Sequence, residues 1–143
     1  MRTPELEAAF LATTYRVVAP ELVFDLRIGE PDPAFAAFLQ QRGVANWGIM
    51  TACNPGGRQT LTENAQRHAA LQARLDTLGL RYLSASNHAD SGKWPVEPGF
   101  CVLDASEETL CRLAAEFGQA AIVFGQTGQC RGQLIWINGL VIE

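Results

Sequence analysis

Three patterns of apolar residues along the chain predict its main elements. Residues 47–52 (WGIMTA) form an apolar run with almost no polar alternation, which is typical of a strand covered on both faces in the middle of a sheet. In residues 22–28 apolar side chains occupy every second position, and this period of two predicts a strand with one buried face. Leucines at helical spacing between residues 60 and 78 predict an amphipathic helix.

The boundary between the apolar strand and this helix carries local signals. Residues 54–57 (NPGG) end the strand, since proline lacks a backbone donor and glycine tolerates positive φ. Thr60 and Glu63 match a capping box, in which each side chain satisfies a free backbone N–H of the first helical turn. An anion at this helix start would have Arg58 or Arg67 beside it. The alternative is an ordinary strand-to-helix turn, because no phosphate-loop spacing is present.

The remaining elements follow from similar start, stop and periodicity signals. Further helices are predicted at residues 4–13, at 34–42 and from 104 or 106 to 118. A β-prone run covers residues 15–18, and further strands are predicted at residues 81–86, 100–103, 120–124 and 133–137. Asn138-Gly139 is a strong hairpin signal, so residues 140–143 are predicted to form a short edge strand.

The order of these elements predicts an α+β fold. From residue 47 to residue 124 the order is strand, helix, strand, strand, helix, strand, which is the βαββαβ arrangement of ferredoxin-like folds. We expect a two-layer sandwich built on a ferredoxin-like unit, extended by an N-terminal helix-strand-helix and a C-terminal β-hairpin. With 143 residues, 48% of them hydrophobic, residues 1–143 are expected to form a single domain.

This topology predicts that polar residues distant in sequence meet at one edge of the sheet. Right-handed crossovers would make strands 47–52 and 100–103 antiparallel neighbours in its centre. The strand ends and loops on one side would then bring together Thr51, Asn54, Asn64, Arg67, Asn87, His88, Trp94, Glu97 and Gln119. The sequence therefore predicts a polar site at this edge.

Charge and cysteine content argue against several classes of function. The formal net charge is −4 and the basic residues are scattered, so nucleic acid is not expected as a main partner. No segment approaches the ~18 consecutive apolar residues that span a bilayer. The first residues also lack the apolar core of a signal peptide, so we expect a cytoplasmic protein without membrane contact. The four cysteines form no C-x-x-C pair, which favours free thiols over a zinc site or a disulfide framework.

Glu97 is the best candidate for chemistry. It lies between Pro95 and Pro98 and near Trp94, so its carboxylate is expected to be partly desolvated and suited to general acid/base catalysis. The alternative is a carboxylate that orders loops by accepting hydrogen bonds from backbone N–H groups or from Arg67.

Side chains with amide, hydroxyl, guanidinium and indole groups surround this glutamate in the predicted site. They are expected to bind a polar ligand, with the indole as a wall of the pocket. Buried amides satisfy loop backbone groups equally often. The predicted ligand-binding set is Thr51, Asn54, Asn64, Arg67, Trp94 and Gln119.

The two histidines are weaker candidates. His88 near Asp90 suggests a metal ligand or an acid/base pair, but a third ligand at recognisable spacing is missing, so no metal site is predicted. His68 is expected to be a half-buried helix residue with one bonded ring nitrogen. A G-x-S-x-G elbow is missing, and no obvious base accompanies Ser84, Ser86 or Ser91, so no serine nucleophile is predicted.

Several short segments carry a family resemblance. In chain order they are LATTY (11–15), TACNP (51–55), ENAQR (63–67), WPVEPGF (94–100) and FGQAAIVFG (117–125). With these segments the chain resembles the bacterial domain-of-unknown-function family 3293. The resemblance implies a fold and the place of a site, but no activity or cofactor. Gly99 stands where that family usually has Ser, and the matching site positions are Thr51, Asn54, Pro55, Asn64, Glu97 and Gln119.

Two hypotheses of different classes follow. In the first, a small polar or anionic, nucleotide-like ligand binds at the sheet edge, with Glu97 as a possible acid or base, and whether the protein is an enzyme stays open. In the second, the chain is a non-enzymatic interaction or regulatory module that pairs through an exposed edge or the C-terminal hairpin. The sequence specifies neither a cofactor nor an oligomeric state.

Overall fold

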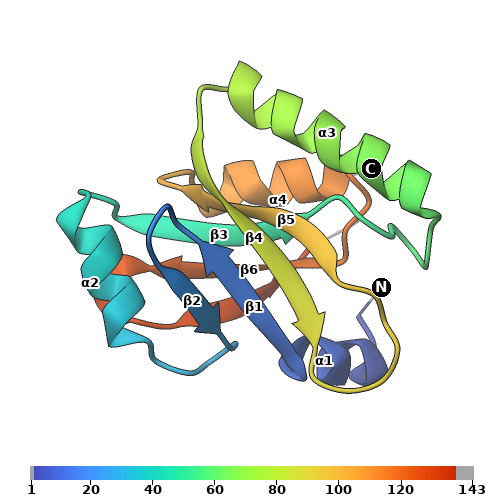
Figure 1. Cartoon of the computed structure of the whole chain (residues 1–143), viewed down its shortest axis with the longest axis horizontal. Helices are drawn as coiled ribbons and strands as arrows, with labels where there is room; N and C mark the ends of the chain where they lie inside the picture. The colour runs from blue at the N-terminus through green and yellow to red at the C-terminus, as the bar shows by residue number, and fades with distance from the viewer. Residues whose placement is uncertain (1, 138–143) are drawn as a thin grey trace.

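Within residues 2–137, which the computed structural model describes, the chain forms four helices, seven strands and one 3-10 turn (Figure 1). The helices are α1 (Pro4–Leu11), α2 (Pro33–Gln41), α3 (Leu61–Thr77) and α4 (Glu107–Glu116). The strands are β1 (Thr13–Val18), β2 (Val23–Leu26), β3 (Asn46–Thr51), β4 (Arg81–Ala89), β5 (Glu97–Leu103), β6 (Ala121–Gln126) and β7 (Gly132–Trp136), with η1 (Thr127–Gln129) between the last two. The helices and strands predicted in this range are confirmed, with shifted ends.

All seven strands form one antiparallel sheet in the order β2-β1-β4-β5-β3-β6-β7. Strands β3 and β5 are neighbours near its centre, with Trp47 opposite Leu103 and Thr51 opposite Gly99. This pairing confirms the predicted contact between the two apolar strands. The sheet is curled, so that β1 and β2 pass in front of β6 in Figure 1.

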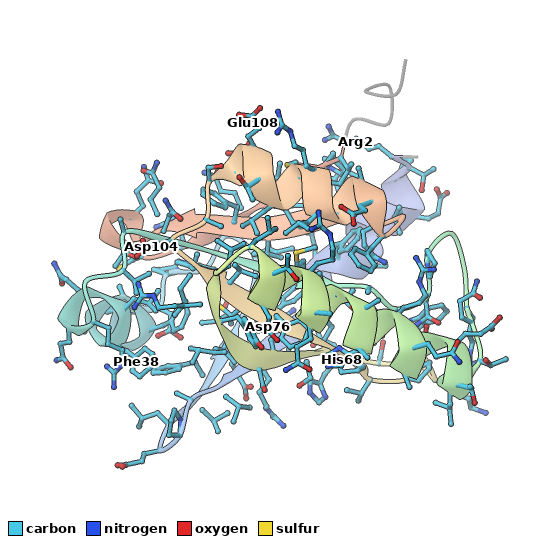
Figure 2. The ribbon with its side chains drawn as sticks, turned by 90° about the horizontal axis from the view of Figure 1, so that it is seen from above. Arg2, Phe38, His68, Asp76, Asp104 and Glu108 are labelled. Atoms are coloured by element: carbon cyan, nitrogen blue, oxygen red, sulfur yellow. The ribbon has the colours of Figure 1, made fainter. Side chains whose placement is uncertain are left out.

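Helices cover both faces of the sheet. On one face α3 and α4 lie side by side (Figures 1 and 2), and their Leu71 and Leu110 pack in one cluster with Val102 of β5. On the other face Phe35 of α2 meets Trp47 of β3 with ring centroids 5.2 Å apart. The structure therefore differs from the predicted two-layer sandwich, because α2 forms a third layer. Helical periodicity identifies an apolar stripe but not the face of the sheet that the stripe covers.

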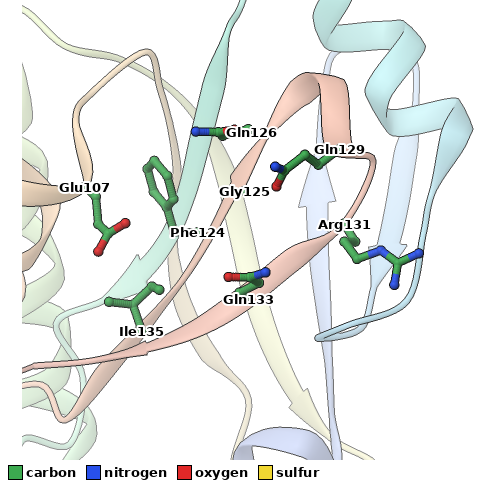
Figure 3. Close-up of a pocket in the computed structure, with 8 residues that line it drawn as sticks. All are labelled: Glu107, Phe124, Gly125, Gln126, Gln129, Arg131, Gln133 and Ile135. Atoms are coloured by element: carbon green, nitrogen blue, oxygen red, sulfur yellow. The ribbon is translucent and has the colours of Figure 1, made fainter.

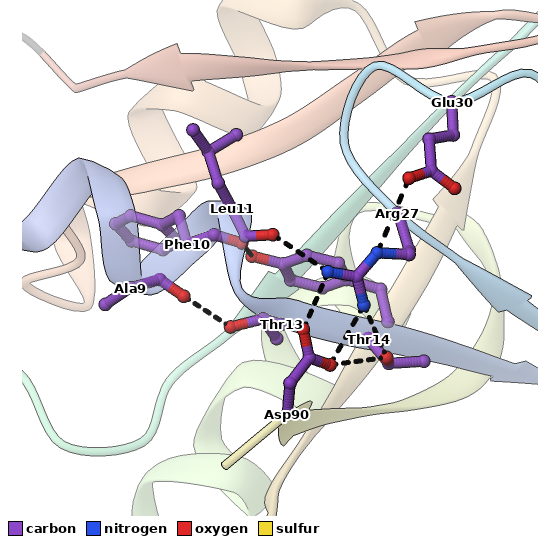
Figure 4. Close-up of polar contacts among 9 residues, drawn as sticks. Ala9, Phe10, Leu11, Thr13, Thr14, Arg27, Glu30 and Asp90 are labelled. Carbon is purple, nitrogen blue, oxygen red and sulfur yellow. Dashed lines mark hydrogen bonds and ion pairs between the residues drawn. The ribbon is translucent and has the colours of Figure 1, made fainter.

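The N-terminal segment holds a β-hairpin between two helices. Strand β1 pairs with β2 on one side and with β4 on the other, so the strand predicted at residues 22–28 is the edge strand β2. Arg27 donates to both carboxylate oxygens of Asp90, at 2.9 and 2.6 Å, and to Thr14 Oγ1 at 3.0 Å (Figure 4). These contacts join the end of the hairpin to the residue that follows β4.

The C-terminal part of the sheet is the hairpin of β6 and β7, connected through η1. The predicted Asn138-Gly139 turn and the edge strand at residues 140–143 lie outside the described residues. None of the helices in the described part has both the length and the apolar character of a membrane span.

Truncation of Leu75 tests the packing of α3. Leu75 is fully buried, with 0% of its surface exposed, whereas Leu61 of the same helix is 85% exposed. Leu75→Ala is expected to lower the free energy of unfolding by about 2–5 kcal/mol, because it removes buried methyl groups and leaves a cavity. The matched change Leu61→Ala should cost less than about 0.5 kcal/mol. Urea denaturation measures both, and equal losses would contradict this packing of α3.

Candidate functional site

The predicted polar site is built where β3 ends, β5 begins and α3 begins. Thr51, the last residue of β3, donates from Oγ1 to the Pro98 carbonyl at 2.8 Å. The same hydroxyl accepts a hydrogen bond from the Cys53 N–H at 3.0 Å. Thr51 is only 8% exposed. Its hydroxyl therefore joins the two central strands and starts the loop, rather than facing a ligand.

Asn54 is the centre of a hydrogen-bond network. Its φ is 51°, in the left-handed region that Asn tolerates better than most residues. Asn54 Oδ1 accepts from the Gln59 N–H at 2.7 Å and from Asn64 Nδ2 at 2.9 Å, while the Asn54 N–H donates to Asn64 Oδ1 at 2.8 Å. Asn54 Nδ2 donates to Glu97 Oε2 at 2.7 Å. The two asparagines therefore hold the loop at the start of α3, and Asn54 also binds the glutamate.

Glu97 is partly buried and is held on one carboxylate oxygen. Its Oε2 accepts from Asn54 Nδ2 at 2.7 Å and from the indole Nε1 of Trp94 at 2.9 Å. No described residue donates a hydrogen bond to Oε1 or forms an ion pair with this carboxylate. Trp94 is 47% exposed, so part of its indole lies open beside the carboxylate. Glu97 thus keeps one acceptor available for another molecule.

Arg67 and Gln119 bind backbone carbonyls. Arg67 donates from Nε to the Ala52 carbonyl and from Nη2 to the Phe117 carbonyl, both at 2.9 Å. Gln119 Nε2 donates to the Cys53 carbonyl at 3.1 Å and to the Phe117 carbonyl at 3.3 Å. Both side chains join the loop after β3 to the end of α4. Their N–H groups therefore bind backbone carbonyls of the protein itself and not an anion at the start of α3.

Two residues beside Glu97 add to the site. Asn87 lies directly opposite Glu97 in the pairing of β4 with β5, and Tyr15 lies opposite Asn87 in the pairing of β1 with β4. Asn87 Oδ1 is buried and has no hydrogen-bond partner among the described residues. Burial raises the pKa of Tyr15, and the Glu97 charge raises it further. Sequence reasoning missed Tyr15, because only the strand register brings it to this edge.

His88 and Asp90 take separate partners. His88 Nε2 lies 2.8 Å from Ser86 Oγ, whereas Asp90 is bound by Arg27 and by Thr14. Ser86 therefore has an imidazole within hydrogen-bond distance, which the sequence did not suggest. The spacing of two residues along a strand places both side chains on the same face of β4.

His68 projects from α3 (Figure 2) and stacks on Phe100 of β5, with ring centroids 4.5 Å apart. Its Nδ1 is buried without a hydrogen-bond partner among the described residues, whereas a bonded ring nitrogen was expected from the sequence. Burial lowers the pKa of His68. The histidine therefore acts as a neutral packing residue in this face of the sheet.

A hollow of about 260 Å³ lies at the other end of β3, between β6, β7 and the start of α4 (Figure 3). Asn46 and Gln126 pair at that end of β3, whereas Glu97 lies near its opposite end. The sequence did not predict this hollow, since its lining comes from strand positions without a motif. The lining residues are Glu107, Phe124, Gly125, Gln126, Gln129, Arg131, Gln133 and Ile135.

Comparison with known families matches residues 50–122 to the family described as protein of unknown function (DUF3293). The chain belongs to this family. The match extends from the end of β3 into β6 and includes all of the predicted site residues. No curated protein and no solved structure gives a significant match.

Gly99, which departs from the Ser that the resemblance implies as usual at this position, has no room for a side chain in this DUF3293 protein. A Cβ atom built on Gly99 would collide with the Met50 carbonyl oxygen and approach Thr51 Cα to 3.3 Å. Both contacts are with backbone, which cannot rotate away. Glycine at this position therefore allows β3 and β5 to approach closely beside Glu97.

Removal of the Arg67 side chain tests its structural role. Arg67→Ala takes one donor from each of the Ala52 and Phe117 carbonyls, so the free energy of unfolding should fall by about 1–3 kcal/mol. Arg58→Ala removes an exposed arginine from the same loop and should change stability by less than about 0.5 kcal/mol. Urea denaturation compares the two variants. If Arg67→Ala leaves the free energy of unfolding unchanged, this arginine does not stabilise the loop.

Acidification should destabilise the protein through His68. Because burial lowers the folded-state pKa of His68 from its ordinary 6.5, the unfolded chain takes up a proton at higher pH than the folded chain. The resulting loss in free energy of unfolding is absent above pH 6.5 and grows as the pH falls through this value toward the folded pKa. Between about pH 7.5 and about pH 5.5, the free energy of unfolding should therefore decrease less in His68→Phe, which keeps a ring on Phe100. Equal decreases in both proteins would refute this role of His68.

Proposed function

We propose that this DUF3293 protein binds a small polar ligand at the edge of the sheet where β3 ends and β5 begins, with Glu97 as the contacting residue. One observation carries the proposal. Glu97 Oε2 accepts two side-chain hydrogen bonds while Oε1 accepts none from the described residues. A carboxylate fixed in this way is preorganised, because its rotamer is held before a ligand arrives.

The amides of the predicted site position Glu97 in this proposal. Asn54 and Asn64 bind each other and the backbone, and Asn54 also binds Glu97. Their hydrogen-bonding groups are used within the fold, so the ligand meets the carboxylate and the exposed part of Trp94. Glu97 would also be the acid or base if the protein catalyses a reaction, since its free oxygen can exchange a proton with a bound molecule.

An anionic, nucleotide-like ligand is the less favoured form of the proposal. The side chains of Thr60 and Glu63 cap the start of α3, and Arg67 is bound to carbonyls. An anion at this helix start would depend on the exposed Arg58.

We also propose that the fold contains a ferredoxin-like unit and that the protein lies in the cytoplasm. The strand order β4-β5-β3-β6, with α3 and α4 on one face, supports a ferredoxin-like βαββαβ unit within the larger sheet. The four cysteines are free, which supports a reducing compartment such as the cytoplasm.

A second candidate function is a protein-interaction or regulatory module. Strand β2 is a sheet edge, and three apolar residues where β1 turns into β2 are exposed, namely Val18, Leu22 and Val23. Such an edge can pair with another chain through its free backbone groups.

A thermal-shift screen tests ligand binding. The purified protein, Glu97→Gln and the control Glu108→Gln are heated with nucleotides, sugar phosphates, amino acids, amines and divalent metal salts. A ligand at ~100 times its Kd stabilises the folded state by about 2.7 kcal/mol, a rise of roughly 5–10 °C in Tm for a chain of this size. The rise should be lost in Glu97→Gln and kept in Glu108→Gln, whose charge lies exposed on α4.

The same screen separates the two candidates. If no compound raises the Tm and Glu97→Gln melts lower than the unchanged protein, the polar network is structural and ligand binding is refuted. Sedimentation that depends on protein concentration would then favour the interaction module.

A further inference from the structure

The site around Glu97 has hydrogen-bond acceptors without donors. Glu97 Oε1 accepts no hydrogen bond from the described residues, and Asn87 Oδ1 is buried without a partner. The two residues are directly opposite in the pairing of β4 with β5. Side chains of such a pair lie on the same face of the sheet, with Cβ atoms about 4.5–5.5 Å apart. Two unfilled acceptors, one of them charged, therefore stand next to each other.

Two arginines of the surrounding elements are already bound elsewhere, and the exposed Arg58 and Lys93 of the adjoining loops form no ion pair with Glu97. Arg67 binds the Ala52 and Phe117 carbonyls, and Arg27 binds Asp90 and Thr14. Glu97 receives only the N–H groups of Asn54 and Trp94, which carry no charge. No described residue therefore forms an ion pair with the Glu97 carboxylate, and its charge can accept a cation from solution.

Trp94 supplies an aromatic surface at the same point. Its Nε1 donates to Glu97 Oε2 at 2.9 Å, so the indole is fixed beside the carboxylate, and 47% of the residue is exposed. The face of an indole attracts a cation within about 6 Å of the ring. Carboxylate, carboxamide oxygen and indole together match a group that carries both positive charge and several hydrogen-bond donors.

We propose that Glu97 Oε1 and the face of Trp94 bind the protonated amino group of an organic amine, with the buried Asn87 Oδ1 beside the carboxylate adding to the negative potential. This inference rests on the proposed function, since it names the class of ligand for the same site. An ammonium group has three donors, of which at least one reaches the carboxylate, while its charge lies against the indole. A phosphate or carboxylate would instead be repelled by the negative charge of Glu97.

A titration with three ligands of one shape tests the charge preference. Benzylamine, benzyl alcohol and sodium benzoate share a ring and differ in carrying a cationic, a neutral and an anionic group near neutral pH. The readout is the indole N–H signal of Trp94 in a two-dimensional NMR spectrum, assigned by its loss in Trp94→Phe. Benzylamine is expected to shift this signal saturably, with a Kd in the millimolar range that suits so small a ligand. Benzyl alcohol and benzoate should bind at least about tenfold more weakly.

Three variants test whether benzylamine binds at the proposed atoms. Glu97→Gln keeps a carbonyl oxygen for Trp94 and Asn54 but removes the charge, so benzylamine binding should weaken at least about tenfold while the spectrum stays folded. Asn87→Leu removes the buried amide oxygen beside the carboxylate and should also weaken binding. Glu108→Gln removes one exposed negative charge from α4 and should leave the Kd unchanged. Sodium chloride at equal ionic strength controls for screening.

The outcomes separate this inference from the function on which it rests. Equal affinity for benzylamine and benzyl alcohol, or equal benzylamine binding in Glu97→Gln, would overturn the amine site. Saturable binding of magnesium chloride that displaces benzylamine would overturn it in favour of a metal ion. If amines fail while a neutral or anionic compound from the thermal screen is lost in Glu97→Gln, the ligand site stands and only its charge class is wrong. If every class fails, both proposals fall.

Discussion

Strand β3 is the constraint on which the rest of this structure depends. It is paired on both sides, by β5 and by β6, and is covered on both faces by helices. Its close packing leaves no room for a side chain at Gly48, where a Cβ atom would collide with Leu110 of α4. Because such a strand cannot shift without breaking two sets of hydrogen bonds and two cores, the loop that follows it leaves the sheet at a fixed point. The candidate site is built on that loop.

The polar residues of the candidate site form two groups with different structural roles. Thr51, Arg67 and Gln119 bind backbone carbonyls, and Asn54 and Asn64 bind loop N–H groups and each other. These contacts follow from the cost of burying an unpaired polar group, which any loop between packed elements must avoid. The second group is Asn87, Trp94 and Glu97. Asn87 Oδ1 and Glu97 Oε1 accept no hydrogen bond from a described residue, and part of the Trp94 indole is exposed.

The charges at this edge of the sheet are arranged differently from what the local sequence suggests. An arginine near a glycine-rich turn and a helix start suggests an anion site, but Arg67 uses its donors on two carbonyls. The capping box supplies an acidic side chain, Glu63, at the same helix start. The charged side chain within the hydrogen-bond network at this edge is instead Glu97. The electrostatic character of the site is therefore set by a carboxylate, which favours donors and cations over anions.

The sequence by itself determined the type of most elements and the region of the site. The capping box at Thr60 and Glu63, the apolar run of β3 and the alternation in β2 are local patterns, because helix and strand preferences depend on residues a few positions apart. Tertiary structure alone decided that α2 covers the second face and that Asn54 binds Glu97, 43 residues away. It also decided that Asn87 stands opposite Glu97. Such contacts depend on strand register and on which face of the sheet each helix covers, and neither is encoded in the local pattern of the segments that meet.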